Sequence, residues 1–410
     1  MKIILDISIF AFMLLSIYIL WLAAVNTAGS LKKDRNYPVA DREGRFAVIV
    51  CARNEERVIG QLLDSLNRQN YGRENYRVFV VAHNCTDNTA TIAEEHGAKV
   101  YIRNNGREKK KVYALKYALD MINSEFPGFF DYYAVLDADC LADKNFLKEI
   151  NNALDTGADI VSGKYSAKNY SANIISRLSG MLYAVVMQGN SRAMNNLFLP
   201  VNIYGSGYAC RMKCADNLEQ YQSQAADFEF STCMVMRGAV MVYAHAAVIY
   251  AEMPVTLHEA LTQRRRWSMG DTQCFRQYGM KLFRMIPSLG ISGFKQFMDL
   301  CMNPVCVLTF LGFILWLVSV LCTGIRASDI IIAASAVILY IAVTISFALQ
   351  TVCKGKMSLS ENIAAVLLFP IWVFLSFIFA VETFFMKDVE WKETVRTSDI
   401  SIEEIQGERR

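Results

Sequence analysis

Residues 132–139 read YYAVLDAD, an apolar run that ends in two aspartates separated by one alanine. Aromatic and branched residues in such a short run favour a buried strand, and the carboxylates follow at its end. Carboxylate oxygens suit Mg²⁺ or Mn²⁺ shared with a diphosphate, while one aspartate reaches the ribose or base. The stretch therefore predicts a metal site at Asp137 and Asp139. The alternative is that the pair caps a helix expected over residues 144–153.

The chain before this stretch repeats one pattern. Apolar runs such as RFAVIVCA end in polar residues, and segments with helical spacing of apolar residues follow them. Strands are expected over residues 45–52, 77–82, 99–102 and 132–136, and helices over 58–69, 89–96 and 111–123. Such alternation implies right-handed crossovers, a mostly parallel sheet and an α/β fold.

Polar clusters follow three of these strands, at residues 53–56, 83–87 and 137–139. Ligands in parallel sheets bind at the carboxyl ends of strands, near the point where the strand order reverses. The clusters therefore predict a nucleotide site. His83 is one of only four histidines, and no second histidine or cysteine is spaced to make it a metal ligand.

Composition limits the classes of protein that fit. The chain has 410 residues, of which 53% are hydrophobic, and a formal net charge of +3. This suits one catalytic domain of about 250 residues with membrane segments, and the near-neutral charge gives no reason to expect a nucleic-acid partner. The eleven cysteines are scattered, without the spacing of a zinc site, and are expected to be reduced thiols.

Four apolar runs are long enough to span a bilayer as helices; they lie at residues 3–24, 304–322, 330–352 and 363–385. Lys32, Lys33 and Arg35 directly follow the first run. Basic residues stay on the inner side of a membrane, which predicts a cytoplasmic catalytic domain in the plasma membrane. Lys354 and Lys356 agree with this orientation.

The C-terminal tail conflicts with the same rule. Three spans after the catalytic domain would place Lys387, Lys392 and Arg396 outside. Either one of the runs is re-entrant or the tail is exported, and both alternatives are open at this stage.

Asp227 begins a segment with helical spacing, expected over residues 228–237. An acceptor hydroxyl must lose its proton as it attacks the anomeric carbon of a sugar, and a positioned carboxylate can take that proton. Asp227 is therefore a candidate base. The alternative is a helix N-cap.

The string QRRRW at residues 263–267 lies in an amphipathic helix expected over residues 257–270. Arginine donors can engage a diphosphate, and an indole ring can stack on a sugar. Two other readings are an anchor on lipid headgroups and a solvated basic face. Similarly, the lysines at residues 109–111 either face solvent or contact a phosphate. The glycines within residues 203–208 allow the backbone to approach a ligand closely.

Taken in order, these strings resemble the family 2 glycosyltransferases, the inverting GT-A enzymes that include cellulose, chitin and hyaluronan synthases. The matching strings are ARNE at residues 52–55, NCTD at 84–87, Lys111, DAD at 137–139, GSG at 205–207, Asp227 and QxxRW at 263–267. The resemblance implies a Rossmann-like GT-A domain with transmembrane and interfacial helices. It also implies a β-linked product from an α-linked donor.

The resemblance implies a role for each matching residue. Asp139 would bind Mg²⁺ or Mn²⁺, with Asp137 also holding the nucleotide, and Asp227 would be the general base. The remaining substrate-binding positions are Glu55 near the nucleoside, Lys111 near the pyrophosphate, Arg266 at the diphosphate, Gln263 and Trp267 at the acceptor sugar, and His83, Gly205 and Ser206.

Three positions depart from the family pattern. Ala82-His83 stands where an aspartate pair usually contacts uracil, which weakens the expectation of a UDP-sugar. Ala226 replaces an acidic residue, and Val112 replaces a glycine.

The leading hypothesis is a multi-pass transferase that extends a polysaccharide and exports it, with homo-oligomer or export partners left open. Transfer of one sugar to a lipid acceptor is the second hypothesis, and an inactive scaffold within a synthase complex is the third. The expected organisation is a helix at 1–26, a GT-A domain at 40–255, interfacial helices at 256–302, three membrane helices at 303–386 and a tail at 387–410.

Overall fold

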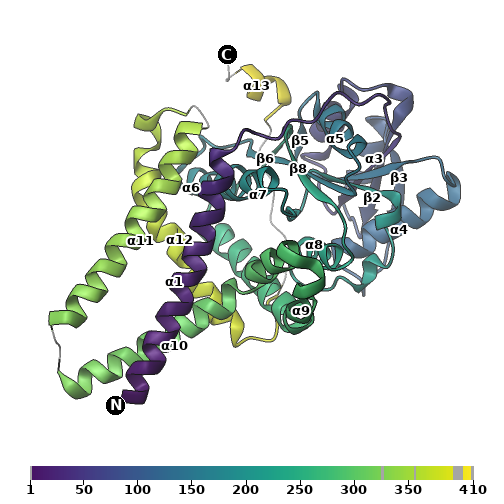
Figure 1. Cartoon of the computed structure of the whole chain (residues 1–410). Coiled ribbons are helices and arrows are strands. Elements are labelled where there is room, and N and C mark those ends of the chain that lie inside the picture. The colour runs from purple at the N-terminus through teal and green to yellow at the C-terminus, as the bar shows by residue number, and fades with distance from the viewer. Residues whose placement is uncertain (1, 325–326, 355–356, 391–399, 408–410) are drawn as a thin grey trace.

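The computed structural model describes residues 2–324, 327–354, 357–390 and 400–407 (Figure 1). A sheet covered by helices makes up one part, and long apolar helices make up the other. The four strands and three helices predicted from the first half of the sequence are all present; they are β1 (Phe46–Ala52), α2 (Ile59–Asn67), β2 (Tyr76–His83), α3 (Thr89–Glu95), β3 (Lys99–Arg103), α4 (Lys111–Glu125) and β4 (Tyr132–Asp137).

Four more strands complete an eight-stranded sheet; they are β5 (Leu141–Ala142), β6 (Ile160–Ala167), β7 (Tyr208–Arg211) and β8 (Met241–Ala251). The strand order is β3-β2-β1-β4-β7-β6-β8-β5. The first four strands are parallel, β7 runs antiparallel to both of its neighbours, and β6 pairs with β8 in parallel. The mixed α/β, Rossmann-like GT-A fold that we expected is confirmed.

The sheet reverses its order at β1. From β1 the chain moves outward to β2 and β3, and then returns to the other side of β1 as β4. Cys51 near the end of β1 is in register with Asp137 at the end of β4. Ligand crevices form where strand order reverses, so this register places the DAD motif at the expected position.

The core fills both faces of this sheet. All but one of the residues of β1 are buried, and successive side chains point to opposite faces. Val48 and Val50 belong to one buried cluster with Leu62 of α2, whereas Ala47 and Ile49 belong to a second cluster with residues of α4. A parallel strand covered on both faces reads as a continuous apolar run, which explains the sequence of β1.

The other helices of the catalytic part lie after β4. They are α5 (Phe146–Asp155), α6 (Ile174–Ala184), the π-helical turn η2 (Val185–Ser191), α7 (Arg192–Asn196) and α8 (Ala226–Met236), with the short 3-10 turns η1 (Arg73–Asn75), η3 (Met212–Cys214) and η4 (Leu218–Gln220). The described cysteines are all free thiols, as expected.

Helix α9 (Leu257–Leu300) links the two parts. Thr256 and Glu259 form a capping box that fixes its start, and Gly290 breaks it with a φ of 58°. The amphipathic helix predicted over residues 257–270 is therefore the first part of a longer element.

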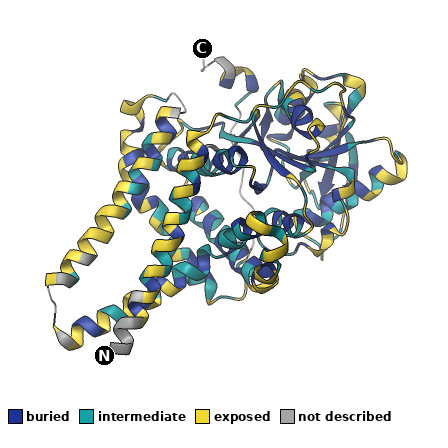
Figure 2. Cartoon of the chain, in the orientation of Figure 1, coloured by how far each residue is buried: buried dark blue, intermediate teal, exposed yellow. Residues whose placement is uncertain are grey.

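Four helices are long and apolar enough to cross a membrane: α1 (Lys2–Leu31), α10 (Met302–Thr323), α11 (Ala327–Lys354) and α12 (Leu359–Phe384). The first of these ends at Leu31, beyond the expected boundary at residue 26. Helices α1 and α10 approach closely, because a Cβ atom on Gly312 would lie 2.6 Å from the Cβ of Ala11. Much of the apolar surface of these helices is exposed (Figure 2).

The described parts of the tail lie against the catalytic domain. Asp388 accepts hydrogen bonds from Gln224 at 2.8 Å and from Gln273 at 3.2 Å. Further on, α13 (Ile402–Gly407) packs Ile402 and Ile405 into a small cluster with residues of β5 and β8. Lys392 and Arg396, on which the charge conflict partly depends, lie outside the described residues.

Candidate active site

The polar loops after β1 and β2 are joined to each other. Asn54 adopts a positive φ of 55°, and its side-chain oxygen accepts a hydrogen bond from the Thr86 amide at 2.9 Å. The Glu55 amide donates to the Thr89 hydroxyl at 2.8 Å. The first two polar clusters predicted from the sequence therefore form one rim of the crevice, with Glu55 in it.

His83 is buried at the end of β2, beside Arg103 from the end of β3. The His83 Nδ1 atom lies 3.4 Å from the Nη1 atom of the Arg103 guanidinium. Burial, followed by the charge of Arg103, lowers the pKa of His83. The lowered pKa favours the neutral form of this imidazole. The sequence did not single out Arg103.

Four of the predicted substrate residues meet at the end of β4. Lys111, the first residue of α4, forms an ion pair with Asp137 and donates to the Gly205 carbonyl at 2.8 Å. The Asp137 amide donates to the Ser206 hydroxyl at 2.8 Å. Gly205 has a φ of +71°, a conformation that glycine adopts without strain. The glycine turn therefore lies beside the DAD motif.

The two aspartates of that motif differ in exposure. Asp139 is buried, whereas the side chain of Asp137 is 32% exposed. Neither caps α5, because the residue before that helix is Asn145. Within the described ranges no three histidine, cysteine, aspartate or glutamate side chains gather as metal ligands. Two carboxylates fit a divalent ion that takes its other ligands from substrate phosphates and water.

Asp227 lies in the first turn of α8, facing the same glycine turn. Its Oδ2 atom accepts a hydrogen bond from the Gly205 amide at 2.5 Å, and it does not cap its own helix, whose N-cap residue is Ala225. Burial raises the pKa of Asp227, although hydrogen bonds from backbone amides and the charges of Lys111 and Arg266 oppose the rise. A carboxylate with a raised pKa is a better proton acceptor, which suits a general base.

Glu229, two residues after Asp227, stabilises the loop that precedes α8. It is fully buried and accepts hydrogen bonds from the Ser223 amide at 2.7 Å and from the Tyr278 hydroxyl at 2.8 Å. These bonds fix the loop that leads into α8. The sequence offered only a weak signal for this role, a second acidic residue two positions after Asp227.

The three arginines of the QRRRW string have three different environments. Arg266 acts electrostatically on Asp227. Arg265 forms an ion pair with Glu382 of α12, and Arg264 is buried over the ring of Trp372. The string is therefore not a solvated basic face. Gln263 occupies the same part of α9, half-buried.

Trp267 begins a row of aromatic rings. Its ring centroid is 5.5 Å from that of Tyr183, at an interplanar angle of 90°. Tyr183 stacks on Tyr165 at 4.9 Å, and Tyr165 in turn lies within electrostatic range of Asp139. The row thus connects the QxxRW motif to the DAD motif. The sequence did not identify either tyrosine, since α6 and β6 carry no motif.

Asp271 is a further acidic residue that the sequence analysis missed. It lies four residues after Trp267 on α9, and Gly270 beside it packs on the backbone of Ala225, just before α8. Burial, followed by the charges of Asp227 and Asp299, raises the pKa of Asp271 to about 8. The charges of two further carboxylates therefore act on Asp271.

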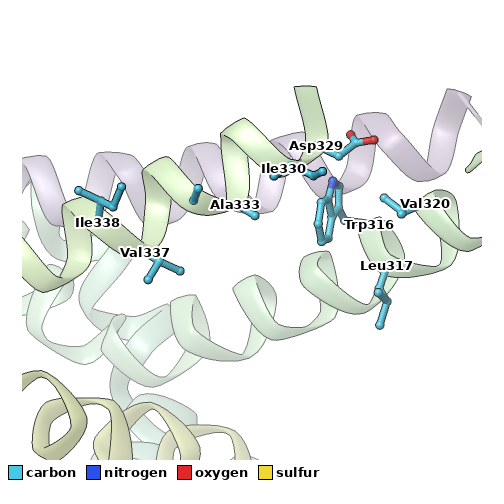
Figure 3. Close-up of a pocket in the computed structure, with 9 residues that line it drawn as sticks. Trp316, Leu317, Val320, Asp329, Ile330, Ala333, Val337 and Ile338 are labelled. Carbon is cyan, nitrogen blue, oxygen red and sulfur yellow. The ribbon is translucent and has the colours of Figure 1, made fainter. Parts of the chain in front are cut away.

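A further cavity lies away from this crevice. About 590 Å³ of space opens between α10 and α11, lined mainly by apolar side chains such as Trp316, Val320 and Val337 (Figure 3). It contains none of the predicted site residues. A gap of this kind between apolar helices suits lipid chains rather than a sugar nucleotide.

Comparison with known proteins covers both parts of the chain. The solved structure of the mannosyltransferase PcManGT from Pyrobaculum calidifontis, in complex with GDP-Man and Mn2+, is similar with a TM-score of 0.61 and 17% sequence identity. The match covers 90% of this chain and 99% of that one, which shows a common fold that includes the long apolar helices.

The curated relatives match a smaller share of the chain. The probable glycosyltransferase YdaM of Bacillus subtilis is 24% identical over 59% of this chain and 58% of its own length. The low-salt glycan biosynthesis hexosyltransferase Agl6 of Haloferax volcanii is 28% identical over 52% of this chain and 48% of its own. The chain thus spans about half the length of these relatives.

A model of the family described as "Glycosyltransferase like family 2" matches residues 44–270. This segment runs from β1 to the part of α9 just after Trp267, so it contains every predicted site residue. The match extends over more than half of the chain and agrees with the observed GT-A sheet. The protein therefore belongs to glycosyltransferase family 2.

Proposed function

We propose that this protein is a membrane-bound inverting glycosyltransferase that transfers a sugar from a nucleotide-sugar to an acceptor held at the membrane. The observation that carries the proposal is the convergence of Lys111, Asp137, Gly205 and Asp227 at the carboxyl end of β4. One side of this cluster is cationic and suits a diphosphate, whereas the other side carries the base. A displacement at an anomeric carbon requires both groups.

The donor side binds the leaving diphosphate. Asp137 and Asp139 would hold Mg²⁺ or Mn²⁺, which supplies positive charge for the departing nucleoside diphosphate. Lys111 and Arg266 add two protein cations on the same side. The related structure with Mn2+ and GDP-Man supports the choice of a metal and of a nucleotide-sugar.

The nucleotide base is read by the rim near His83. The resemblance to family 2 makes a UDP-sugar the first donor to test. Because His83 stands where the family usually has an aspartate that contacts uracil, we propose a GDP-sugar as the second. A neutral histidine can either donate or accept one hydrogen bond to a base edge.

On the acceptor side Asp227 takes the proton of the attacking hydroxyl. The Gly205 amide orients the carboxylate, and Glu229 holds the loop before it. The rings of Trp267 and Tyr183 offer an apolar face on which an acceptor sugar stacks.

We propose a lipid-linked acceptor rather than a long polymer exported by the chain itself. Helix α11 exposes most of its apolar side chains, among them Ile330, Val337 and Leu339. The described helices thus spread as a fan beside the catalytic domain rather than as a ring (Figure 1). A relative from Methanococcus voltae is named for transfer to a dolichyl-phosphate-linked sugar, which supports this acceptor class.

Extension of a polymer is the second candidate. The row of Trp267, Tyr183 and Tyr165 favours it, because consecutive rings can bind more than one sugar unit. Product size distinguishes the two candidates: purified protein in vesicles is incubated with labelled UDP- and GDP-sugars and either Mg²⁺ or Mn²⁺. We expect a single-sugar glycolipid. A ladder of products would favour extension, and release of nucleotide without any transfer from all donors would contradict both.

The position of the tail bears on membrane topology. Asp388 and α13 contact the catalytic domain, so the tail and this domain lie on one side of the bilayer. An even number of crossings must therefore separate them. We propose that α10 and α11 cross as a hairpin and that α12, which pairs Glu382 with Arg265 of the interfacial helix α9, is the re-entrant segment. By the positive-inside rule the catalytic domain is cytoplasmic.

A further inference from the structure

Arg264 is a buried arginine in an apolar setting. It lies on the part of α9 that packs against α12, and only 5% of its surface is exposed. Its neighbours belong to a cluster that includes Ala260, Phe369 and Trp372. A guanidinium is charged at every physiological pH, so its burial needs a compensating partner.

The partners that Arg264 has are neutral. Its Nη2 atom donates to the hydroxyl of Ser376, and its guanidinium carbon lies 4.9 Å from the centroid of the Trp372 ring. No carboxylate pairs with it in the described part of the chain. Burial accordingly lowers the pKa of Arg264 to about 10.

Three hydrogen-bond donors remain unused at this point. The Nε and Nη1 atoms of Arg264 are buried without a partner, and so is the indole Nε1 of Trp372. The ring covers the face of the guanidinium, but the unused N–H groups lie in the guanidinium plane, where an aromatic face cannot accept them. All three groups are donors, so the missing partner must be an acceptor.

The neighbouring arginines show that the position is unusual. Arg265 is paired with Glu382, and Arg266 has Asp227 in its electrostatic environment. Arg264 is the member of the string that has no anion within the residues described here. Its place between helices that carry apolar surface excludes bulk water as the natural partner.

We propose that Arg264, together with the indole N–H of Trp372, binds the phosphate of an anionic membrane lipid that enters between α11 and α12. Phosphate oxygens accept several hydrogen bonds at once and match the forked geometry of a guanidinium. Most of the apolar side chains of α11 are exposed, so the acyl chains of a lipid would lie along this helix. The inference rests on the proposed membrane location and does not depend on the proposed acceptor.

Lipid retention by the purified full-length protein tests this proposal. The protein is prepared in a neutral detergent, titrated with phosphatidylglycerol or phosphatidylcholine, and analysed by native mass spectrometry. We expect one tightly retained phosphatidylglycerol and weaker retention of phosphatidylcholine. Arg264→Gln should weaken phosphatidylglycerol retention by about tenfold to a hundredfold, because charged hydrogen bonds are lost. Arg265→Gln is the matched control and should leave retention unchanged.

Two further variants keep the test decisive if Arg264→Gln does not fold. Arg264→Lys preserves the charge and should retain part of the affinity, whereas Trp372→Phe removes only the indole donor and should lower the affinity by a smaller factor. Equal retention of both lipids, or unchanged retention in all three variants, would overturn the proposal. Displacement of the lipid by an equal concentration of inorganic phosphate would assign the site to a free anion and reject the lipid. None of these readouts requires transfer activity, so they are separate from tests of the proposed function.

Discussion

The donor side and the acceptor side of the crevice are built differently. On the donor side, Asn54, Thr86 and Thr89 tie two loops together, and Lys111 already pairs with Asp137. On the proposed acceptor side, Trp267 and Tyr183 present rings, and burial together with two neighbouring carboxylates raises the pKa of Asp271. The donor site is thus organised before the substrate arrives, whereas the acceptor side carries groups that a ligand would complete.

Asp227 lies at the border of the two sides, and the loss of its carboxylate should have the largest effect on transfer. Asp227→Asn keeps the hydrogen bond geometry with Gly205 nearly intact but cannot accept a proton. Transfer should fall by about a hundredfold to ten-thousandfold. Nucleotide binding, measured by calorimetry with the nucleoside diphosphate and Mn²⁺, should remain unchanged. Substantial transfer by this variant would show that another group is the base.

Asp139→Asn tests the donor side alone. Loss of one carboxylate should weaken the metal-dependent binding of the nucleoside diphosphate and lower transfer by about a hundredfold, because the metal stabilises the leaving group by several kcal/mol. The readout is the Mn²⁺ concentration that gives half-maximal activity, which should rise. Asp64→Asn, at an exposed carboxylate outside the crevice, is the control. An unchanged metal requirement would remove Asp139 from the metal site.

Trp267→Ala tests the acceptor side. The lost stacking of one ring should raise the KM for the acceptor by up to about tenfold and leave slow hydrolysis of the donor unaffected. Tyr183→Phe serves as the matched control, since it keeps the ring that contacts Trp267. Equal loss of transfer and donor hydrolysis would contradict a role in acceptor binding.

The difference between the two sides also explains which features could be predicted from the sequence. The strands β1 to β4 and their helices were found because each buried parallel strand is a continuous apolar run that ends in a polar loop. The approach of Gly205 to Asp137 was expected only from the resemblance, because these residues are far apart in the chain. Tyr165, Tyr183 and Asp271 were missed, since no local pattern marks them and only the packing of α6 and α9 brings them to the crevice.

The three arginines at residues 264–266 show most clearly what a sequence pattern cannot predict. Three consecutive arginines look equivalent in the sequence, and every local reading treats them as one feature. Successive residues of a helix point about 100° apart, so Arg264, Arg265 and Arg266 contact three different surfaces. Tertiary packing alone determines which of them meets the base, which forms an ion pair and which remains without an anion.

The smallest expected effect concerns the pH dependence of stability on the acceptor side. The pKa of Asp271 is raised to about 8 in the folded protein from its ordinary value near 4. The folded state therefore holds a proton that the unfolded state releases, so Asp271 lowers the free energy of unfolding progressively as the pH rises from about 4 to about 8. Asp271→Asn removes this dependence and should melt a few degrees higher than the natural protein at pH 8.

At pH 4 the two proteins should melt at nearly the same temperature, because the carboxyl group is then protonated in both states. Differential scanning fluorimetry in detergent across this pH range measures the difference directly. Asp120→Asn, which alters an exposed carboxylate beside Lys116, is the control and should show no such trend. If the difference in melting temperature between the Asp271 variant and the natural protein does not grow with pH, this carboxylate is solvated. The acceptor side would then be more open to water than the donor side.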